Sequence, residues 1–311
     1  MQEESTAIPA PSSVGPRWRR RLIRLAVFAL LAYLLVCLIV WSLQTKLIFP
    51  GSFSQGKSFA VVHPSSFYEL IELKTRDGNR TFAAFGAAID ELRRPLPDSA
   101  ARPTLIYFYG NGEHLAHALG TMSWLRGCGA NVLAVEYVGY GMADGSPSEQ
   151  GVYATADAAY EYLMTRGDID RTKIVPFGWS LGAAAAFDLA SRRPVAGVVA
   201  CSAFTDMPTM ARHVFPWLPT SLLLRSRFDN LAKLARIDKP ILLAHGLDDD
   251  LVPYRMSEAL RSAAGNARLV PIEHAGHNDL LTAGREKLSA ELTEFLGAIS
   301  APSTRPSDPP R

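Results

Sequence analysis

The chain has 311 residues, of which 32 are basic and 30 acidic, so its formal net charge is only +2. This balance provides no basic patch for nucleic acid, which we therefore exclude as a partner. The three cysteines, Cys37, Cys128 and Cys201, have neither the paired spacing of metal ligands nor that of a disulfide framework. We expect no metal site, and the sequence implies no cofactor.

A long apolar segment near the N-terminus predicts a membrane anchor. Residues 22–43 are apolar except for Arg24 and Ser42. A helix of this length spans about 33 Å, which is enough to cross a bilayer. Five arginines lie between positions 17 and 24, whereas only Lys46 follows the segment closely. By the positive-inside rule, the N-terminus is cytoplasmic and the rest of the chain lies on the opposite, periplasmic or extracytoplasmic side.

A cleaved signal sequence is the alternative interpretation of this segment. The apolar run is long for a signal peptide, and no small-residue cleavage site follows it. The letters LLVC ending at Cys37 resemble a lipoprotein signal, but Val36 is bulky at the cleavage position and the apolar run continues beyond it. We therefore predict an uncleaved, single-pass anchor.

The remaining chain reads as one globular domain between two tails. We expect residues 1–21 to form a basic, disordered N-terminus and residues 301–311 a second disordered tail. The domain spans residues 44–300 and contains no internal repeat. Within it, residues 205–238 form a mixed segment in which we expect a short lid.

The domain begins with two strands that are joined by an Asp-Gly turn, a typical hairpin signal. Apolar strands then alternate with helices, which is typical of a parallel sheet covered on both faces. A capping box at Ser146–Glu149, with Pro147 in the first helical position, predicts a helix that continues to Thr165. We expect the last helix over residues 279–299. In such sheets ligands bind at the carboxyl ends of the strands, so the loops there are the candidate site.

Ser180 lies between two glycines, in the sequence Gly178-Trp179-Ser180-Leu181-Gly182, where a predicted strand meets a predicted helix. The Gly-x-Ser-x-Gly pattern in this context is typical of a sharp turn that exposes a nucleophilic serine. The partial positive charge of the helix N-terminus also favours an anion there. The alternative is a helix-capping serine in a glycine-rich turn.

A serine nucleophile needs a base and an orienting acid. The loop after the last strand contains His274 and His277, and we favour His277 because it lies at the apex between Gly276 and Asn278. The acid is to be sought in the turn after residues 240–244, where Asp248, Asp249 and Asp250 follow one another, and Asp206 is a less favoured alternative. Serine, acid and histidine then occur in the chain order that this architecture requires.

An oxyanion hole would use the backbone N–H groups of Leu181 and Asn111. Asn111 lies in the loop after strand 104–110, between Gly110 and Gly112, which permit an unusual backbone path and a close approach of substrate. The alternative is an ordinary glycine-rich turn.

Several motifs together resemble the α/β-hydrolase fold: YFYGNGEHL, GWSLGAAAAFDLA, HGLDDDLVP and EHAGHND. With LQTKLIFPG after the apolar segment, the chain is similar to the membrane-anchored group of Bem46-like proteins, over about residues 41–299. The resemblance implies that Asp249 is the acid, and it agrees with His277 as the base. The chain departs from the group at Tyr109 and Val138, where histidine and arginine are usual.

Apolar residues of the lid-like segment, with Tyr109 and Trp179, are candidates for the substrate pocket; in the segment these are chiefly Phe215 and Trp217. Packing on the sheet is the alternative for the lid residues. We predict a membrane-anchored serine esterase or thioesterase that acts on an acyl-containing small molecule, a lipid or an acylated protein.

Two other functions are compatible with the sequence. A serine peptidase of the aminopeptidase type would need a group that binds a free amine, such as Glu113 or an acid in the lid. A non-catalytic binding protein on the same fold is less favoured, because it has no need of a complete set of Ser180, Asp249 and His277.

Overall fold

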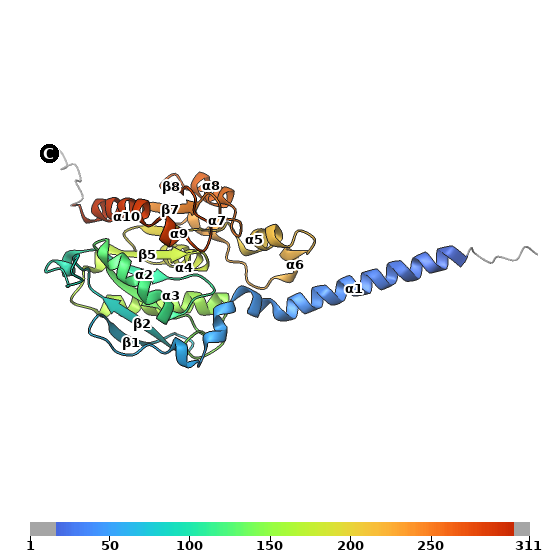
Figure 1. Cartoon of the computed structure of the whole chain (residues 1–311), viewed down its shortest axis with the longest axis horizontal. Coiled ribbons are helices and arrows are strands. Elements are labelled where there is room, and N and C mark those ends of the chain that lie inside the picture. Colours follow the sequence, from blue (N-terminus) through green and yellow to red (C-terminus); the bar gives the residue numbers. More distant parts are fainter. Residues whose placement is uncertain (1–16, 302–311) are drawn as a thin grey trace, which may run out of the picture. The chain divides into compact units, whose positions relative to one another are not determined.

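The computed structural model describes residues 17–301 and divides the chain into two compact units, Met1–Leu43 and Gln44–Arg311 (Figure 1). Of the expected tails, residues 1–16 and 302–311 lie outside the described residues, whereas residues 17–21 belong to the first helix and are not disordered. Helix α1 (Arg17–Ile48) has a mean hydropathy of 2.7 over its most apolar 18 residues. In length and composition this helix is suited to cross a membrane, and a signal sequence has the same properties.

An eight-stranded sheet organises the second unit, in the order β1-β2-β4-β3-β5-β6-β7-β8. The hairpin of β1 and β2 is antiparallel, β2 pairs antiparallel with β4, and the other neighbours are parallel, which confirms the predicted sheet. The strands are β1 (Glu69–Lys74), β2 (Arg80–Gly86), β3 (Thr104–Phe108), β4 (Asn131–Val135), β5 (Ile174–Trp179), β6 (Val198–Cys201), β7 (Ile241–Gly246) and β8 (Ala267–Ile272).

Helices cover both faces of this sheet, as the complete burial of β3 to β7 requires. Helices α3, α4, α7 and α8 contact one another in series on one face. On the other face, Trp124 of α2 donates a hydrogen bond to Ser289 of α10 at 2.8 Å. The helices are α2 (Leu115–Gly127), α3 (Glu149–Thr165), α4 (Leu181–Arg192), α5 (Met207–Val214), α6 (Thr220–Leu223), α7 (Asn230–Leu234), α8 (Tyr254–Ala263), α9 (Leu280–Ala283) and α10 (Arg285–Ser300).

The predicted start of α3 is wrong. The helix begins at Glu149, and Ser148 caps it by accepting a hydrogen bond from the N–H of Gly151 at 3.0 Å. The Glu149 carboxylate does not complete a capping box with Ser146, because it accepts the N–H groups of Arg227 and Phe228 at 2.6 and 2.8 Å. Glu149 thereby fastens the end of the lid-like segment to the body of the domain.

The expected last helix is divided in two at Gly284, where α9 ends and α10 begins. A Cβ at this position would lie 2.6 Å from the Ile272 side chain of β8. The helix is therefore interrupted at a glycine whose backbone passes close to strand β8.

Candidate active site

Ser180 occupies the sharp turn between β5 and α4. Its φ of 55° and ψ of −115° lie in a region that residues other than glycine rarely adopt. The Ser180 N–H donates to the carbonyl of Cys201 on the neighbouring strand β6 at 2.9 Å, which stabilises the turn. The turn follows the carboxyl end of strand β5.

The two glycines around Ser180 permit contacts between backbones. A Cβ at Gly178 would collide with the carbonyl of Gly182, and a Cβ at Gly182 would collide with that of Phe108. Any side chain at either position would push α4 away from β3 and β5, so the motif is required for the packing as well as for the turn.

We expect Gly182→Ala to lower the free energy of unfolding by about 3 kcal/mol, because rigid backbone blocks the added methyl group. Thermal unfolding of the purified chain measures this effect. Gly120→Ala is the matched control: it lies in α2, where a Cβ meets nothing within 4 Å, and should be neutral or stabilising. Equal melting temperatures for both variants would contradict the packing argument.

Ser180, His277 and Asp249 form one chain of hydrogen bonds. Nδ1 of His277 lies 2.8 Å from Oδ2 of Asp249, and Nε2 lies 3.0 Å from Oγ of Ser180. A carboxylate only accepts, so Nδ1 carries the proton and Nε2 is left to accept from the serine hydroxyl. This is the tautomer that a general base requires. All three residues are buried.

The surroundings of Asp249 keep it ionised. Burial alone would raise the pKa of this carboxyl, but hydrogen bonds from His245 and His277 and from the N–H of Val252 lower it more, and the net pKa is below its usual range. The N–H of Val252 and that of Leu251 donate to Oδ1 at 2.7 and 3.1 Å. Both oxygens of the carboxylate are thus held in place.

His245 also belongs to the candidate site, although the sequence analysis does not predict it. Its side chain is completely buried, and its Nε2 lies 2.8 Å from the carbonyl of Val252 and 3.2 Å from Oδ2 of Asp249. Both of these groups accept, so Nε2 carries a proton that they share. In the sequence, this contact is indicated by the histidine of HGLDDD, which lies four positions before Asp249.

A cavity of about 310 Å³ opens above Ser180. Within the described part of the chain, the N–H groups of Leu181 and Asn111 have no hydrogen-bond acceptor. The first of these groups starts helix α4, and the second lies in the loop that forms one wall. They are available to an oxyanion. The lining residues are Gly110, Asn111, Gly112, Glu113, Trp179, Ser180, Leu251, His277 and Asn278.

Asn111 is held by the last residue of α1 and the segment after it, both of which belong to the second unit. Its side-chain amide donates to the carbonyl of Ile48 at 3.0 Å, and its own carbonyl accepts the N–H of Gly51 at 2.9 Å. The hydroxyl of Tyr140 donates to the same carbonyl at 2.9 Å. A Cβ at Gly51 would lie 2.8 Å from this oxygen, so the segment fits only with glycine there. These contacts fix the backbone orientation of Asn111.

Tyr109 is buried in the core and does not line the cavity, contrary to its expected place in the pocket. Its hydroxyl donates to the carboxylate of Glu136, which also accepts the N–H of Leu115 at 3.2 Å. Burial raises the pKa of Glu136 to about 7. Since Tyr109 and Leu115 flank the loop of Asn111, Glu136 holds both ends of that loop.

Glu136 makes the stability of the chain depend on pH. Its carboxyl has an ordinary pKa of 4.5 and a folded pKa of about 7, so the folded state retains a proton that the unfolded chain releases. Stability is therefore lost as the pH rises from about 4.5 to about 7. We expect Glu136→Gln to reduce this loss, as measured by urea unfolding at several pH values. An unchanged pH slope would contradict the assignment.

The other predicted pocket residues are divided between the cavity and the surface. Trp179 lines the cavity, whereas Phe215 and Trp217, with exposed fractions of 42% and 56%, are not among its lining residues. The carboxylate of Asp206 accepts the N–H of Thr209 at 2.8 Å as the cap of α5, so its role is structural.

The mostly parallel sheet with helices on both faces, and the sharp strand-turn-helix at Ser180, are typical of the α/β-hydrolase fold. A solved esterase of Pyrococcus furiosus has this fold, with a TM-score of 0.61 and 20% identity, over 78% of this chain and 96% of its own. A puromycin-hydrolyzing peptidase of Mycobacterium tuberculosis has a TM-score of 0.59 and 19% identity, over 78% of this chain and 42% of its own. Residues 154–300 match the prolyl oligopeptidase family, Peptidase_S9.

Sequence comparison gives a narrower placement. The protein bem46 of Schizosaccharomyces pombe is 32% identical over 77% of this chain and 81% of its own. The α/β-hydrolase domain-containing protein WAV2 of Arabidopsis thaliana is 30% identical over 85% of this chain and 91% of its own. The chain therefore belongs to the α/β-hydrolase family that includes bem46 and WAV2, as its motifs predict.

Proposed function

We propose that the chain is a membrane-anchored serine hydrolase that cleaves acyl esters or thioesters. The observation that carries this proposal is the unbroken hydrogen-bond chain from Asp249 through His277 to Ser180. A binding protein would need none of this arrangement.

The roles of the residues follow from their positions. Ser180 Oγ attacks the acyl carbonyl as His277 Nε2 accepts its proton, and Asp249 stabilises the resulting imidazolium. The oxyanion accepts hydrogen bonds from the N–H groups of Leu181 and Asn111. His277 then protonates the leaving alcohol or thiol, which leaves an acyl-serine. Water, deprotonated by the same histidine, hydrolyses this intermediate and releases the acid.

Residues 22–43 would place this site at a membrane surface, with the N-terminus in the cytoplasm and the hydrolase domain on the opposite side. Lipids, acylated proteins and small acyl compounds are accessible there. A protease added to sealed, inside-out vesicles tests the orientation: it should remove the N-terminal tail and spare the domain.

A peptidase activity is the second candidate, and one observation favours it. Glu113 lines the cavity above Ser180, and its Oε2 is buried without a hydrogen-bond partner among the described residues. Burial raises the pKa of this carboxyl to about 7, and an amine bound beside it would favour its ionised form. The match to the prolyl oligopeptidase family points in the same direction.

The experiment that tests the proposal is labelling of membranes that carry the chain with a fluorophosphonate, followed by a comparison of substrates. We expect labelling, and faster release of acid from nitrophenyl butyrate and a butyryl thioester than of nitroaniline from aminoacyl anilides. Faster anilide cleavage that Glu113→Gln abolishes would establish the peptidase instead. No labelling of folded chain would refute both activities.

A further inference from the structure

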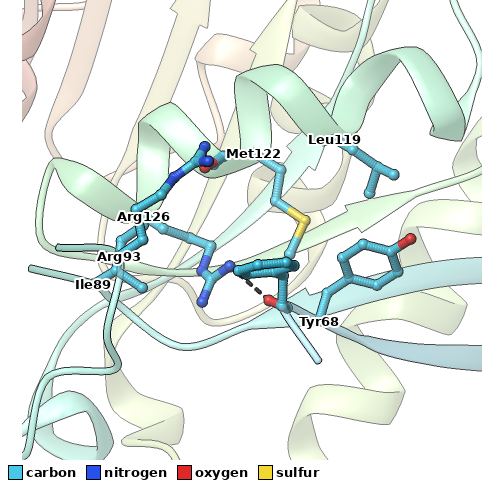
Figure 2. Close-up of a pocket in the computed structure, with 8 residues that line it drawn as sticks. Tyr68, Ile89, Arg93, Leu119, Met122 and Arg126 are labelled. Atoms are coloured by element: carbon cyan, nitrogen blue, oxygen red, sulfur yellow. Dashed lines mark hydrogen bonds between the residues drawn. The ribbon is translucent and has the colours of Figure 1, made fainter. Parts of the chain in front are cut away.

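A second cavity, of about 170 Å³, lies between α2 and the segments that flank the hairpin of β1 and β2 (Figure 2). It shares no lining residue with the cavity above Ser180. Most of its surface is apolar, but it also contains two arginines. The lining residues are Phe67, Tyr68, Ile89, Arg93, Leu119, Met122, Ser123 and Arg126.

Arg126 is a buried cation without a carboxylate partner in the described part of the chain. The residue is only 7% exposed, and its Nε and Nη1 donate to the carbonyls of Ala87 and Phe67 at 2.6 and 2.7 Å. A Cβ at Gly86 would lie 2.6 Å from its Nε, so the sequence leaves room for the guanidinium. Buried charges are normally paired with an opposite charge.

Arg93 supplies a second positive charge to the same cavity. Its φ of 61° is unusual for a residue other than glycine, and its Nη2 donates to Oγ of Ser123 at 2.8 Å. The same turn contains Asp90 and Glu91, of which Asp90 is already bound by Nε of Arg94 at 2.9 Å. Among residues 17–301, no carboxylate forms an ion pair with Arg93.

The two positively charged guanidinium groups repel each other. Burial and the proximity of Arg93 lower the pKa of Arg126, as expected for like charges. An anion between them would relieve this repulsion and form charge-assisted hydrogen bonds with both. The chain itself brings no such anion to the described cavity.

We propose that this cavity binds a carboxylate that carries a short apolar chain. In Figure 2 the two guanidinium groups lie at one end of the cavity, while Leu119 and Tyr68 lie at the other. A carboxylate fits the planar fork of an arginine with two parallel hydrogen bonds, and the apolar chain would contact Leu119 and Met122. A carboxylic acid of this kind is also the product class of acyl-ester hydrolysis, although the site does not depend on that activity.

Calorimetric titration of the full-length chain in a neutral detergent tests the proposal, with hexanoate, hexanol and inorganic phosphate as probes. We expect saturable binding of hexanoate and none of hexanol. Arg93→Gln, which alters an exposed side chain, should raise the dissociation constant for hexanoate at least about tenfold. Arg94→Gln is the matched control, because Arg94 pairs with Asp90, and it should leave binding unchanged.

Three outcomes would overturn the proposal. Hexanoate that does not bind excludes the site. Hexanoate that binds equally to the Arg93→Gln variant occupies another place, such as the cavity above Ser180. Phosphate that binds more tightly than hexanoate, with the same dependence on Arg93, shows an anion site without recognition of the apolar chain.

Discussion

Ser180→Ala is expected to lower the hydrolysis of an acyl ester by at least about a thousandfold and to abolish covalent labelling by a fluorophosphonate. The hydroxyl is the only group on the turn that can form the acyl intermediate. The loss should fall on kcat, because the cavity and the two proposed oxyanion donors remain. Steady-state kinetics with nitrophenyl butyrate and gel detection of the label measure both effects.

Three further variants complete this experiment. His277→Ala should lose nearly as much activity as Ser180→Ala, and the double variant should lose little more, because the residues act as a unit. Ser191→Ala is the control, since this serine lies on the same helix α4 and its Oγ donates only to the carbonyl of Asp188. Full activity in Ser180→Ala would refute the assigned nucleophile.

Asp249→Asn is expected to reduce kcat by about ten-thousandfold with little change in KM. The amide has nearly the shape of the carboxylate, so the hydrogen bonds from the N–H groups of Leu251 and Val252 to Oδ1 are preserved. The contact of His245 Nε2 with Oδ2 is lost, because the NH2 group takes the place of that oxygen. The amide cannot stabilise a positive charge on His277, however, and its NH2 group favours a proton on Nε2 of the histidine. The base would then present a proton to Ser180 instead of accepting one.

The neighbouring acids provide the control for this variant. Asp248→Asn and Asp250→Asn should retain nearly full activity, because these side chains are exposed and neither bonds to His277 in the structure. A larger loss in either of them than in Asp249→Asn would show that the acid is assigned to the wrong position.

The candidate nucleophile and the candidate base can be proposed from sequence because each is marked by a local pattern. Ser180 needs only a strand, a tight turn and a helix, and all three are visible within a few residues. His277 occupies the apex of a short loop after the last strand. The acid was not predictable in this way: three successive aspartates share one turn, and only the resemblance to known relatives favours Asp249.

The features that the sequence analysis did not predict depend on contacts between segments that are distant in the chain. The buried Tyr109 points to Glu136, which is 27 positions away. Phe215 and Trp217 have the apolar character of a pocket wall, yet nothing local indicates that they lie outside the cavity. The start of α3 was misplaced for the same reason, because the lid-like segment uses the carboxylate that the capping box required.

The hydrogen bond between Asn111 and Ile48 has a practical consequence for soluble forms of the protein. A form that begins immediately after the apolar run, at Gln44, retains Ile48 and Gly51, whereas one that begins at the first residue of strand β1 loses both. The shorter form would keep Ser180, Asp249 and His277 and yet lack the contacts that hold Asn111, the proposed oxyanion donor. Weak activity of the shorter form would then result from the loss of the contacts with Asn111, and not from the absence of a suitable substrate.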